Sequence, residues 1–452
     1  MKKVVIYMMM IAFVVSMLFT GIGCEEEAAP AEETAEEAAP AEEVTEEEAE
    51  EEAEGKVVLV IRTGVEADGL RASGEAYTEK TGIEVEITEV GREGYFATVP
   101  TQLLGGTSDF DVVFFLSTSI AEMAEAGVLE PIDDYINNPD LTDPAEYDSE
   151  DILATYGYKD KTYGLPTTIS THYLYYREDL IENPPQTWDE HFEVAKNFTK
   201  SINPDSPTTY GALFDCLPGE ELPKSFYSVL YSFKGDIIDE DGNVVINSPE
   251  AVEAANQYLK YIDAGILPED ILSYGFSDVF EALQTGEVAM AGPFWDAAMG
   301  GILIGDSPFK DSIKVTLIQG VKDNDEINRV PFQHSWCLVL NKNSKNLEGA
   351  WKFLNYATGK EGGKIVTTVS GSSPSRISLL TDPELLAIFP HYALHAESLK
   401  IAKSEPSVVF YPQMHDAMNT ALTKIITGEM EPQAAFDEAA STIQAMLEAQ
   451  SE

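Results

Sequence analysis

The chain has 452 residues, of which 79 are acidic and 28 are basic, and its formal net charge at pH 7 is −51. Such a surplus of negative charge repels a phosphate backbone, so the composition excludes nucleic acid as a partner. The three cysteines lack the spacing of a metal site and no phosphate-binding glycine loop is found, so we expect no metal and no cofactor. We expect Cys216 and Cys337 to be buried thiols, with a disulfide between them as the alternative.

The first 23 residues have the layout of a secretory signal peptide. Lys2 and Lys3 precede an uncharged apolar run over residues 4–20, and small residues then lead to Cys24. This ending resembles the lipobox of bacterial lipoproteins, in which the cysteine is lipidated and becomes the mature N-terminus. We therefore expect residues 1–23 to be removed and Cys24 to anchor the protein in the lipid bilayer, on the periplasmic or outer side of the cell membrane. A signal anchor with an incidental cysteine is the alternative.

The segment 24–54 is expected to be an acidic, flexible tether. Residues 25–54 hold 16 glutamates and no cation, so they cannot bury an apolar face and they repel one another. Pro30 and Pro40 argue against the alternative, a single long helix. The remaining residues, 55–452, carry 63 acidic and 26 basic side chains, a net charge of −37, which we interpret as a solvated acidic surface. They are too many for one typical core, so two lobes are expected.

The folded part opens with a predicted βαβαβ unit. Residues 57–61 form a continuous apolar run, residues 83–87 alternate, and residues 112–116 are apolar again, with helical stretches between them. This order predicts a buried parallel sheet, and Pro100 predicts a kink or an early end of the second helix. Ligands of such sheets sit beyond the carboxyl ends of the strands. The candidates there are Thr63, Gly64, Phe115, Ser117 and Thr118.

Start signals mark several helices further along the chain. Thr187 and Glu190 form a capping box, Ser248 caps a helix that opens with a proline, and apolar residues repeat at helical spacing over 347–354. The acidic stretch 239–243 is in the wrong register for a calcium loop, so we expect a hairpin turn there instead.

Motifs of one known family recur along the folded part. One is YGLP at 163–166, followed by LYYREDL at 174–180 and PQTWDE at 185–190. In chain order, the matching segments are 105–113, 126–133, 163–166, 174–180, 185–190, 286–295, 341–354, 371–376 and 427–443. Together they resemble the extracellular solute-binding proteins, family 1, which serve ABC importers of carbohydrates and include maltose-binding protein.

The resemblance implies an α/β fold of the periplasmic-binding-protein type II, with two lobes, each a mixed sheet flanked by helices, and the ligand in the cleft between them. Lobe one would comprise residues 55–169 and 337–377, and lobe two residues 170–336 and 378–452. The implied protein is a monomer and no enzyme. It would capture a mono- to oligosaccharide by lobe closure and deliver it to the transmembrane subunits of an ABC permease, while segments 168–172 and 334–337 absorb the rotation.

A sugar site needs flat aromatic platforms and convergent polar groups. We expect Trp295 to be the main platform and Trp336 a second one, whereas Trp188 and Trp351 lie in helical motifs and are expected in the core. His334 stands where the family often has a glycine, which narrows the cleft or adds hydrogen bonds. The remaining polar candidates lie in loops at strand ends and can bind hydroxyls. They are Thr63, Ser117, Thr118, Thr168, Ser170, Ser372, Ser373 and Arg376.

Other functions are weighed against this one. A membrane-anchored glycoside hydrolase needs two carboxylates at a set separation, and no motif isolates such a pair. His391 and His395 have helical spacing, but Tyr392 stands where a metalloprotease motif needs its glutamate. A binding protein for a polyamine, a metal complex or a peptide, or a signalling receptor, stays open. Several buried carboxylates in the cleft would favour a polyamine.

Overall fold

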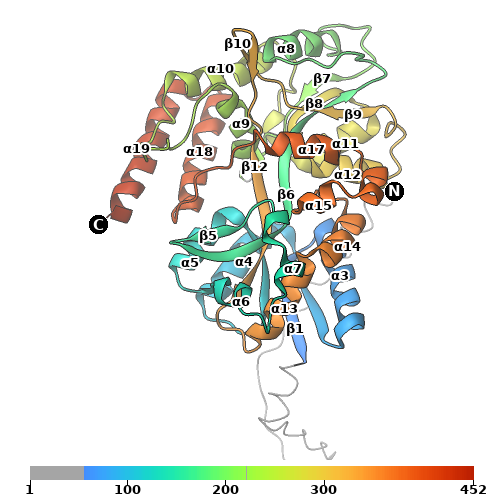
Figure 1. Ribbon diagram of the computed structural model, residues 1–452. Helices are drawn as coiled ribbons and strands as arrows, with labels where there is room; N and C mark the ends of the chain where they lie inside the picture. Colours follow the sequence, from blue (N-terminus) through green and yellow to red (C-terminus); the bar gives the residue numbers. More distant parts are fainter. Residues whose placement is uncertain (1–54, 220, 452) are drawn as a thin grey trace, which may run out of the picture. The chain divides into compact units, whose positions relative to one another are not determined.

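The structure is a computed structural model that describes residues 55–219 and 221–451. The predicted signal peptide, Cys24 and the acidic tether therefore lie outside the described residues. The described chain is a mixed α/β fold in two lobes (Figure 1).

Ten strands of the described chain join in one sheet, whose main path runs β2-β1-β3-β12-β6-β8-β7. The strands on this path are β1 (Lys56–Arg62), β2 (Glu84–Val90), β3 (Val112–Leu116), β6 (Lys161–Arg177), β7 (Tyr210–Leu213), β8 (Val288–Trp295) and β12 (Gln333–Asn341). Beside this path, β4 (Leu129–Glu130) pairs with β12, while β5 (Tyr156–Tyr158) and β9 (Ile313–Thr316) pair with β6. A separate hairpin joins β10 (Val321–Asp323) to β11 (Glu326–Asn328).

The predicted βαβαβ opening is confirmed. Strand β1 pairs in parallel with both β2 and β3, and the connecting helices are α3 (Val65–Thr81) and α4 (Arg92–Leu104). Two expectations were wrong in part. Strand β2 lies at the sheet edge, and none of its residues is fully buried, since exposed and half-buried positions alternate along most of it. Helix α4 does not end at Pro100 but continues to Leu104. Proline lacks only the N–H that would bond to a carbonyl in the preceding turn, so the residues after it can still form helical hydrogen bonds.

The long strands β6 and β12 connect the two lobes. Residues 164–171 of β6 pair with β12, and residues 172–176 pair with β8. Within this pairing, His334 lies opposite Ser170 and Trp336 lies opposite Thr168. Figure 1 shows both strands running between the elements around β1 and those around β8. The segments predicted to absorb lobe closure are thus paired with each other in the sheet.

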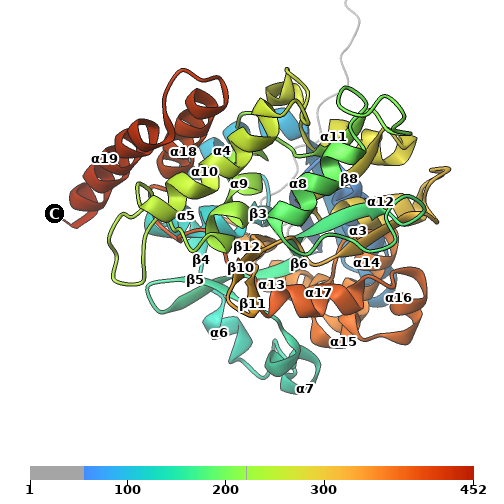
Figure 2. The same ribbon diagram turned by 90° about the horizontal axis from the view of Figure 1, so that it is seen from above.

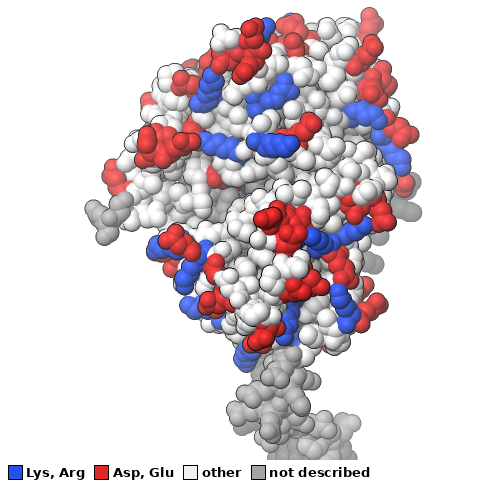
Figure 3. All heavy atoms as spheres, viewed as in Figure 1, with Lys and Arg blue, Asp and Glu red and all other residues white. Residues whose placement is uncertain are grey.

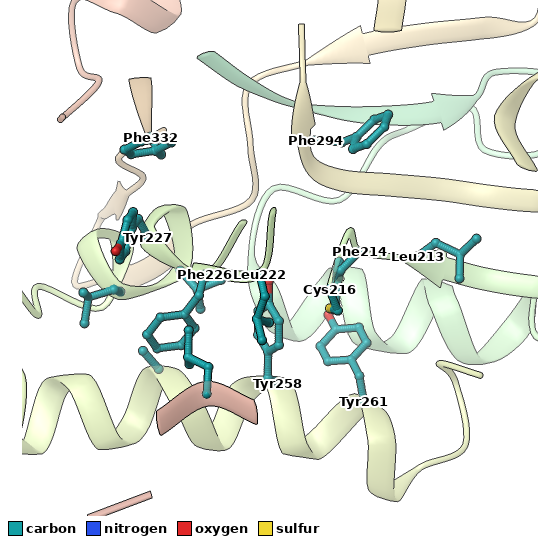
Figure 4. Packing of buried hydrophobic residues seen from close by; sticks show 14 of the residues in the cluster. Leu213, Phe214, Cys216, Leu222, Phe226, Tyr227, Tyr258, Tyr261, Phe294 and Phe332 are labelled. Atoms are coloured by element: carbon teal, nitrogen blue, oxygen red, sulfur yellow. The ribbon is translucent and has the colours of Figure 1, made fainter. Parts of the chain in front are cut away.

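Separate hydrophobic cores lie on either side of this junction. Alternate residues of β1 and β3 face two clusters, so that Leu59 and Val60, for example, belong to different ones. A larger cluster surrounds β8 and contains Phe214, Tyr258 and Tyr261, whose rings contact one another (Figure 4). The lobe boundaries given above stay a prediction, and Trp336, which they assign to the second lobe, packs in the cluster of the first.

The other helices cover the sheet and extend along its ends. They are η2 (Ser117–Ser119), α5 (Ile120–Glu125), α6 (Asp133–Ile136), α7 (Pro144–Tyr147), η3 (Ser149–Asp151), α8 (Trp188–Asn197), α9 (Glu221–Ser232), α10 (Pro249–Asp263), η4 (Ile271–Ser273), α11 (Phe276–Thr285), α12 (Ala297–Ile304), α13 (Leu347–Ala357), α14 (Lys360–Ser370), α15 (Ile377–Leu380), α16 (Pro383–Ile388), α17 (Tyr392–Leu399), α18 (Tyr411–Ile426) and α19 (Pro432–Ser451). The last two pack against each other, side by side in Figures 1 and 2.

The local signals read from the sequence are confirmed. Thr187 and Glu190 form the capping box of α8, and the Ser248 hydroxyl accepts a hydrogen bond from the backbone N–H of Ala251 at the start of α10. The stretch 239–243 is a turn, since the Asp239 carboxylate accepts bonds from the following backbone and residues on either side of the turn form an antiparallel bridge. No group of potential metal ligands occurs among the described residues.

The buried side chains also follow expectation. Cys216 and Cys337 are buried free thiols, and Trp188 and Trp351 lie in the cores. Within the described part of the chain, no helix combines the length and apolar character that crossing a bilayer requires. Acidic side chains are spread among basic ones on the face shown in Figure 3, which agrees with a solvated acidic surface rather than one concentrated patch.

Candidate functional site

Trp336 lies at the carboxyl end of the first lobe's strands. Its ring stacks on Phe114 of the adjacent strand, with centroids 4.7 Å apart and planes only 1° from parallel. The guanidinium carbon of Arg62 lies 4.6 Å from the same ring, in a cation–π arrangement. Phe96 of α4 lies 6.0 Å away at a tilt. Trp336 is therefore held by neighbours, and 8% of it is exposed.

Trp295 ends β8 in the second lobe, and its ring is also covered by protein. His334 stacks on it with centroids 4.4 Å apart and planes 22° apart, and His172 lies edge-on at 4.2 Å. The indole Nε1 donates a hydrogen bond to Glu221 Oε2 at 3.3 Å. Since His334 also lies 6.4 Å from Trp336, one line of rings joins the two predicted platforms across the lobe junction.

Burial shifts the pKa values of two acids near Trp295. Burial first, and then the Glu221 carboxylate, raise the pKa of Asp215 well above its usual range. Burial likewise raises the pKa of Asp296, which follows Trp295 directly, to about 7. The Asp296 carboxylate accepts a hydrogen bond from the backbone N–H of Thr171 on β6 at 2.9 Å. Desolvation thus disfavours negative charge beside this tryptophan.

The predicted hydroxyl groups gather near the crossing strands. The Ser117 hydroxyl accepts a hydrogen bond from the backbone N–H of Ser335 at 3.2 Å. Thr118 is buried, and its hydroxyl has no hydrogen-bond partner among the described residues. Thr168 is buried within β6, while Ser170 on the same strand is half-buried. Thr63 and Gly64 lie exposed at the entry to α3, so they can meet solvent.

Arg376 and the loop before it occupy a different environment. The guanidinium Nε donates to the Thr358 carbonyl at 2.7 Å, and Nη1 donates to the Tyr147 carbonyl at 3.0 Å and lies 3.4 Å from Asp151 Oδ2. Only 1% of Arg376 is exposed. The Ser372 carbonyl accepts a hydrogen bond from the Tyr392 hydroxyl. The Arg376 side chain thus links backbone carbonyls of two separate segments, which gives it a structural role in this conformation.

A hollow of about 540 Å³ opens beside the line of rings. One side is formed by α4, the end of β3, η2 and α5, and the other by the loop before α9 and the start of α18. The lining residues are Tyr95, Phe96, Ala97, Pro100, Thr101, Leu104, Phe115, Leu116, Ser119, Glu122, Met123, Gly219, Tyr411, Pro412, His415, Asp416 and Asn419. Both lobes therefore contribute to one cavity of the size that small-molecule ligands occupy.

Aromatic and polar groups share the surface of this hollow. Phe96 is 38% exposed and presents a ring from α4, opposite Tyr411 at the start of α18. The Gly219 backbone is fixed from both ends, because its N–H donates to the Asn419 side chain at 2.8 Å and its carbonyl lies 2.9 Å from His415 Nε2. The second lobe thus holds its wall of the hollow in place.

The comparison with known proteins decides the family. The profile described as bacterial extracellular solute-binding protein matches residues 63–364, which is well over half of the chain. The chain belongs to this family. The resemblance drawn from the sequence motifs is confirmed, and the protein is a solute-binding protein of an ABC transporter.

Individual relatives of this solute-binding protein are distant but cover it well. A putative binding protein of Brucella abortus is 25% identical over 426 residues, 87% of this chain and 97% of the relative. A probable ABC transporter-binding protein of Deinococcus radiodurans is 24% identical, covering 81% of this chain and 87% of the relative. The maltose-bound structure of T. maritima MalE3 has a TM-score of 0.74 and 25% identity, covering 86% of this chain and 99% of that one. The two-lobed periplasmic-binding-protein fold is therefore confirmed.

Of the site residues predicted for the solute-binding protein, only Phe115 lines the hollow. Trp295, Trp336 and His334 lie along the adjoining line of rings, and Arg376 lies apart from it. Sequence reasoning missed Phe96 and Tyr411 in the hollow. A signal for Tyr411 was present, because two aromatic residues and a proline, at 410–412, open a helix.

Proposed function

We propose that this solute-binding protein captures a carbohydrate, from a mono- to an oligosaccharide, between its lobes and delivers it to the membrane subunits of an ABC importer. The observation that carries the proposal is the hollow lined from both lobes. Its aromatic rings suit the apolar faces of sugar rings, and its hydroxyl, amide and carboxyl groups suit their hydroxyls. The relative from T. maritima was solved with maltose bound, which supports the same ligand class.

The proposed ligand set combines the hollow and its extension toward the crossing strands. Phe96 and Tyr411 would contact sugar faces, and the Thr118 hydroxyl would gain a hydrogen bond that it lacks among the described residues. Phe115 and Trp336 continue this surface inward. Closure of the lobes, with β6 and β12 absorbing the rotation, would bring both walls onto the ligand, and the closed form would then be favoured by ligand binding.

A polyamine is the second candidate ligand, because Glu122 and Asp416 both line the hollow. Two carboxylates could bind two ammonium groups. Burial, however, raises the pKa of Glu122, which disfavours the anion that a polyamine needs. The raised pKa of Asp215 near Trp295 acts in the same direction. These shifts favour the carbohydrate over the polyamine.

The test is thermal unfolding of the detergent-solubilised full chain with a panel of saccharides and with spermidine. A ligand that binds only the folded state raises the melting temperature. At a concentration 100 times the dissociation constant, it raises the free energy of unfolding by about 2.7 kcal/mol. We expect a rise with at least one saccharide. No rise with any saccharide, together with a clear rise with spermidine, would refute the carbohydrate proposal and establish the alternative.

We further propose that Cys24 is lipidated and tethers the protein to the outer face of the cell membrane. The supporting pattern is the apolar leader that ends at this cysteine and the acidic tract that follows it. A flexible chain of 30 residues spans roughly 30 Å, and repulsion between its glutamates extends it further. Such a tether would let a two-lobed receptor reach its permease while staying near the membrane.

A further inference from the structure

Two histidines and one tryptophan meet where the lobes join. His172 comes from β6, His334 from β12 and Trp295 from the end of β8, so three strands bring these rings together. His334 stacks on the indole at 4.4 Å, while His172 meets it edge-on at 4.2 Å. The face of Trp295 that a sugar ring could use is therefore already covered by an imidazole.

Each of these histidines keeps a ring nitrogen without a hydrogen-bond partner among the described residues. In His334 this atom is Nδ1, and in His172 it is Nε2. Both side chains are more than nine-tenths buried. Other buried histidines, His191 among them, also have such an atom, so the missing partner alone does not indicate a ligand site. At His172 and His334 it coincides with a position at the lobe junction, where a ligand can supply the partner.

One ring nitrogen of His172 is bound by the protein. The Ser228 hydroxyl accepts a bond from the backbone N–H of Phe332 at 2.8 Å and lies 2.8 Å from His172 Nδ1. A hydroxyl can accept two hydrogen bonds and donate one, so Ser228 serves either tautomer of His172. His172 Nε2 is a donor in one tautomer and an acceptor in the other, and in both it lacks a partner among the described residues.

Both imidazoles are neutral at ordinary pH. Burial, followed by the positive charge of Lys224 on α9, lowers the pKa of His172 to about 3. Burial also lowers the pKa of His334 well below 6.5, and Lys224, His172 and Arg62 add to the effect. The carboxyl groups near these rings are Glu221, which accepts a hydrogen bond from the indole N–H of Trp295, Asp296, which follows that tryptophan, and Asp215, whose pKa Glu221 helps to raise. A neutral imidazole offers one donor and one acceptor, as a sugar hydroxyl does.

These rings lie beside the hollow and do not line it. Phe96 lines the hollow and lies 6.0 Å from Trp336, which lies 6.4 Å from His334. Trp336 packs in the core of the first lobe and Trp295 in the core of the second, and both histidines are on the strands that connect the lobes. Opening of the lobes would separate the walls on either side of the imidazoles and admit a ligand between them.

We infer that His172 and His334 are specificity-determining residues of the ligand site, and that they select an uncharged, polyhydroxylated ligand, a neutral sugar or a sugar alcohol, over a sugar acid, a sugar phosphate or a polyamine. This inference rests on the proposed carbohydrate-binding function. The neutral rings bring no charge to balance an anion, and their free nitrogens match hydroxyl groups. His334 in addition occupies the tryptophan face, so the ligand bonds to the imidazole instead of stacking on Trp295.

The first experiment uses the wild-type full chain and needs no variant. Thermal shift at pH 7.5 compares glucose, galactose, maltose, maltotriose, ribitol and mannitol with glucuronate, galacturonate, glucose 6-phosphate and spermidine. We expect stabilisation by neutral compounds, sugars and sugar alcohols being separate arms, and none by their acidic counterparts. Neither imidazole titrates between pH 5.5 and 8, so we expect this preference for neutral compounds at both ends of that range.

The second experiment removes the nitrogens while keeping a ring. His334→Phe and His172→Phe should each weaken the calorimetric affinity for the best neutral ligand at least ten-fold, and His334→Gln, which restores a polar group, should recover part of it. His191→Phe is the matched control. His191 is equally buried, has its pKa lowered to about 3 by burial and contacts Tyr261 in the second lobe's core, so its loss should leave affinity within two-fold of wild type.

The outcomes separate this inference from the function on which it rests. Tighter binding of a sugar acid or a sugar phosphate than of any neutral compound would overturn the inference alone. Wild-type affinity in both phenylalanine variants would also overturn it while leaving carbohydrate binding intact. Absence of binding by every saccharide and sugar alcohol would instead refute the proposed function, and the inference with it.

Discussion

Replacing Arg376 by methionine distinguishes a structural role from a ligand-binding one. The guanidinium donates to the carbonyls of Thr358 and Tyr147 and lies 3.4 Å from the Asp151 carboxylate. Methionine fills much of the same volume with an unbranched apolar chain but has no donor. The Arg376→Met variant therefore leaves two buried carbonyls and one buried carboxylate without this partner.

The expected loss follows from burial. Removing one partner of a buried ion pair destabilises a protein by about 3–5 kcal/mol, since the remaining charge stays desolvated. Asp151 keeps two hydrogen bonds, both at 2.7 Å, from the backbone N–H and the hydroxyl of Ser378. Because these bonds offset part of the loss, we expect the free energy of unfolding to fall by about 3 kcal/mol.

Urea unfolding at pH 7, followed by tryptophan fluorescence, measures this change, and calorimetry measures saccharide affinity at a temperature where the variant is folded. Lys80→Met is the control, because the ion pair between Lys80 and Glu361 is more than half exposed and its loss should change stability by less than about 1 kcal/mol. We expect unchanged affinity in Arg376→Met. Wild-type stability combined with ten-fold weaker binding would refute the structural assignment and place Arg376 in the ligand site.

Two further predictions concern other parts of the chain. Since burial raises the pKa of Asp296 to about 7 in the folded state, the protonated form stabilises the fold fully below about pH 4, and this contribution is lost as the pH rises toward 7. The stability of Asp296→Asn relative to wild type should increase from pH 5 to pH 8, by at most about 4 kcal/mol in urea unfolding. The same difference between variant and wild type at both pH values would contradict the assignment. Labelled fatty acid should enter the wild-type protein but not Cys24→Ser in growing cells, and equal labelling of both would rule out lipidation at this residue.

The sequence predicts those parts of the fold that local interactions decide. The capping box at Thr187 and the helix start at Ser248 depend on residues three positions apart, and both occur as expected. The apolar run at 112–116 forms a fully buried strand. Family motifs then supply the arrangement of the lobes. Where neighbours in the chain determine the structure, the amino-acid pattern alone is sufficient.

The candidate site depends on contacts between distant segments, which a single sequence does not show. Trp295 was expected to present an open face, but β12 brings His334 onto it. Arg376 has the character of a ligand residue in the sequence, yet carbonyls from two other segments bind its guanidinium. Phe96 and Tyr411 meet in the hollow only because helices from different lobes approach each other. None of these contacts leaves a periodic signal.

The place of β12 in the sheet has a consequence for how the chain is made. This strand lies between β3 and β6, but more than two hundred residues separate the end of β3 from its start. At about 5–20 residues per second, a ribosome needs roughly 10 to 40 s to supply them. Throughout that interval the edge of β3 has no final neighbour, and an unpaired apolar edge invites pairing with other chains. The first lobe, although it begins the folded part, is completed only after the larger part of the second has been synthesised.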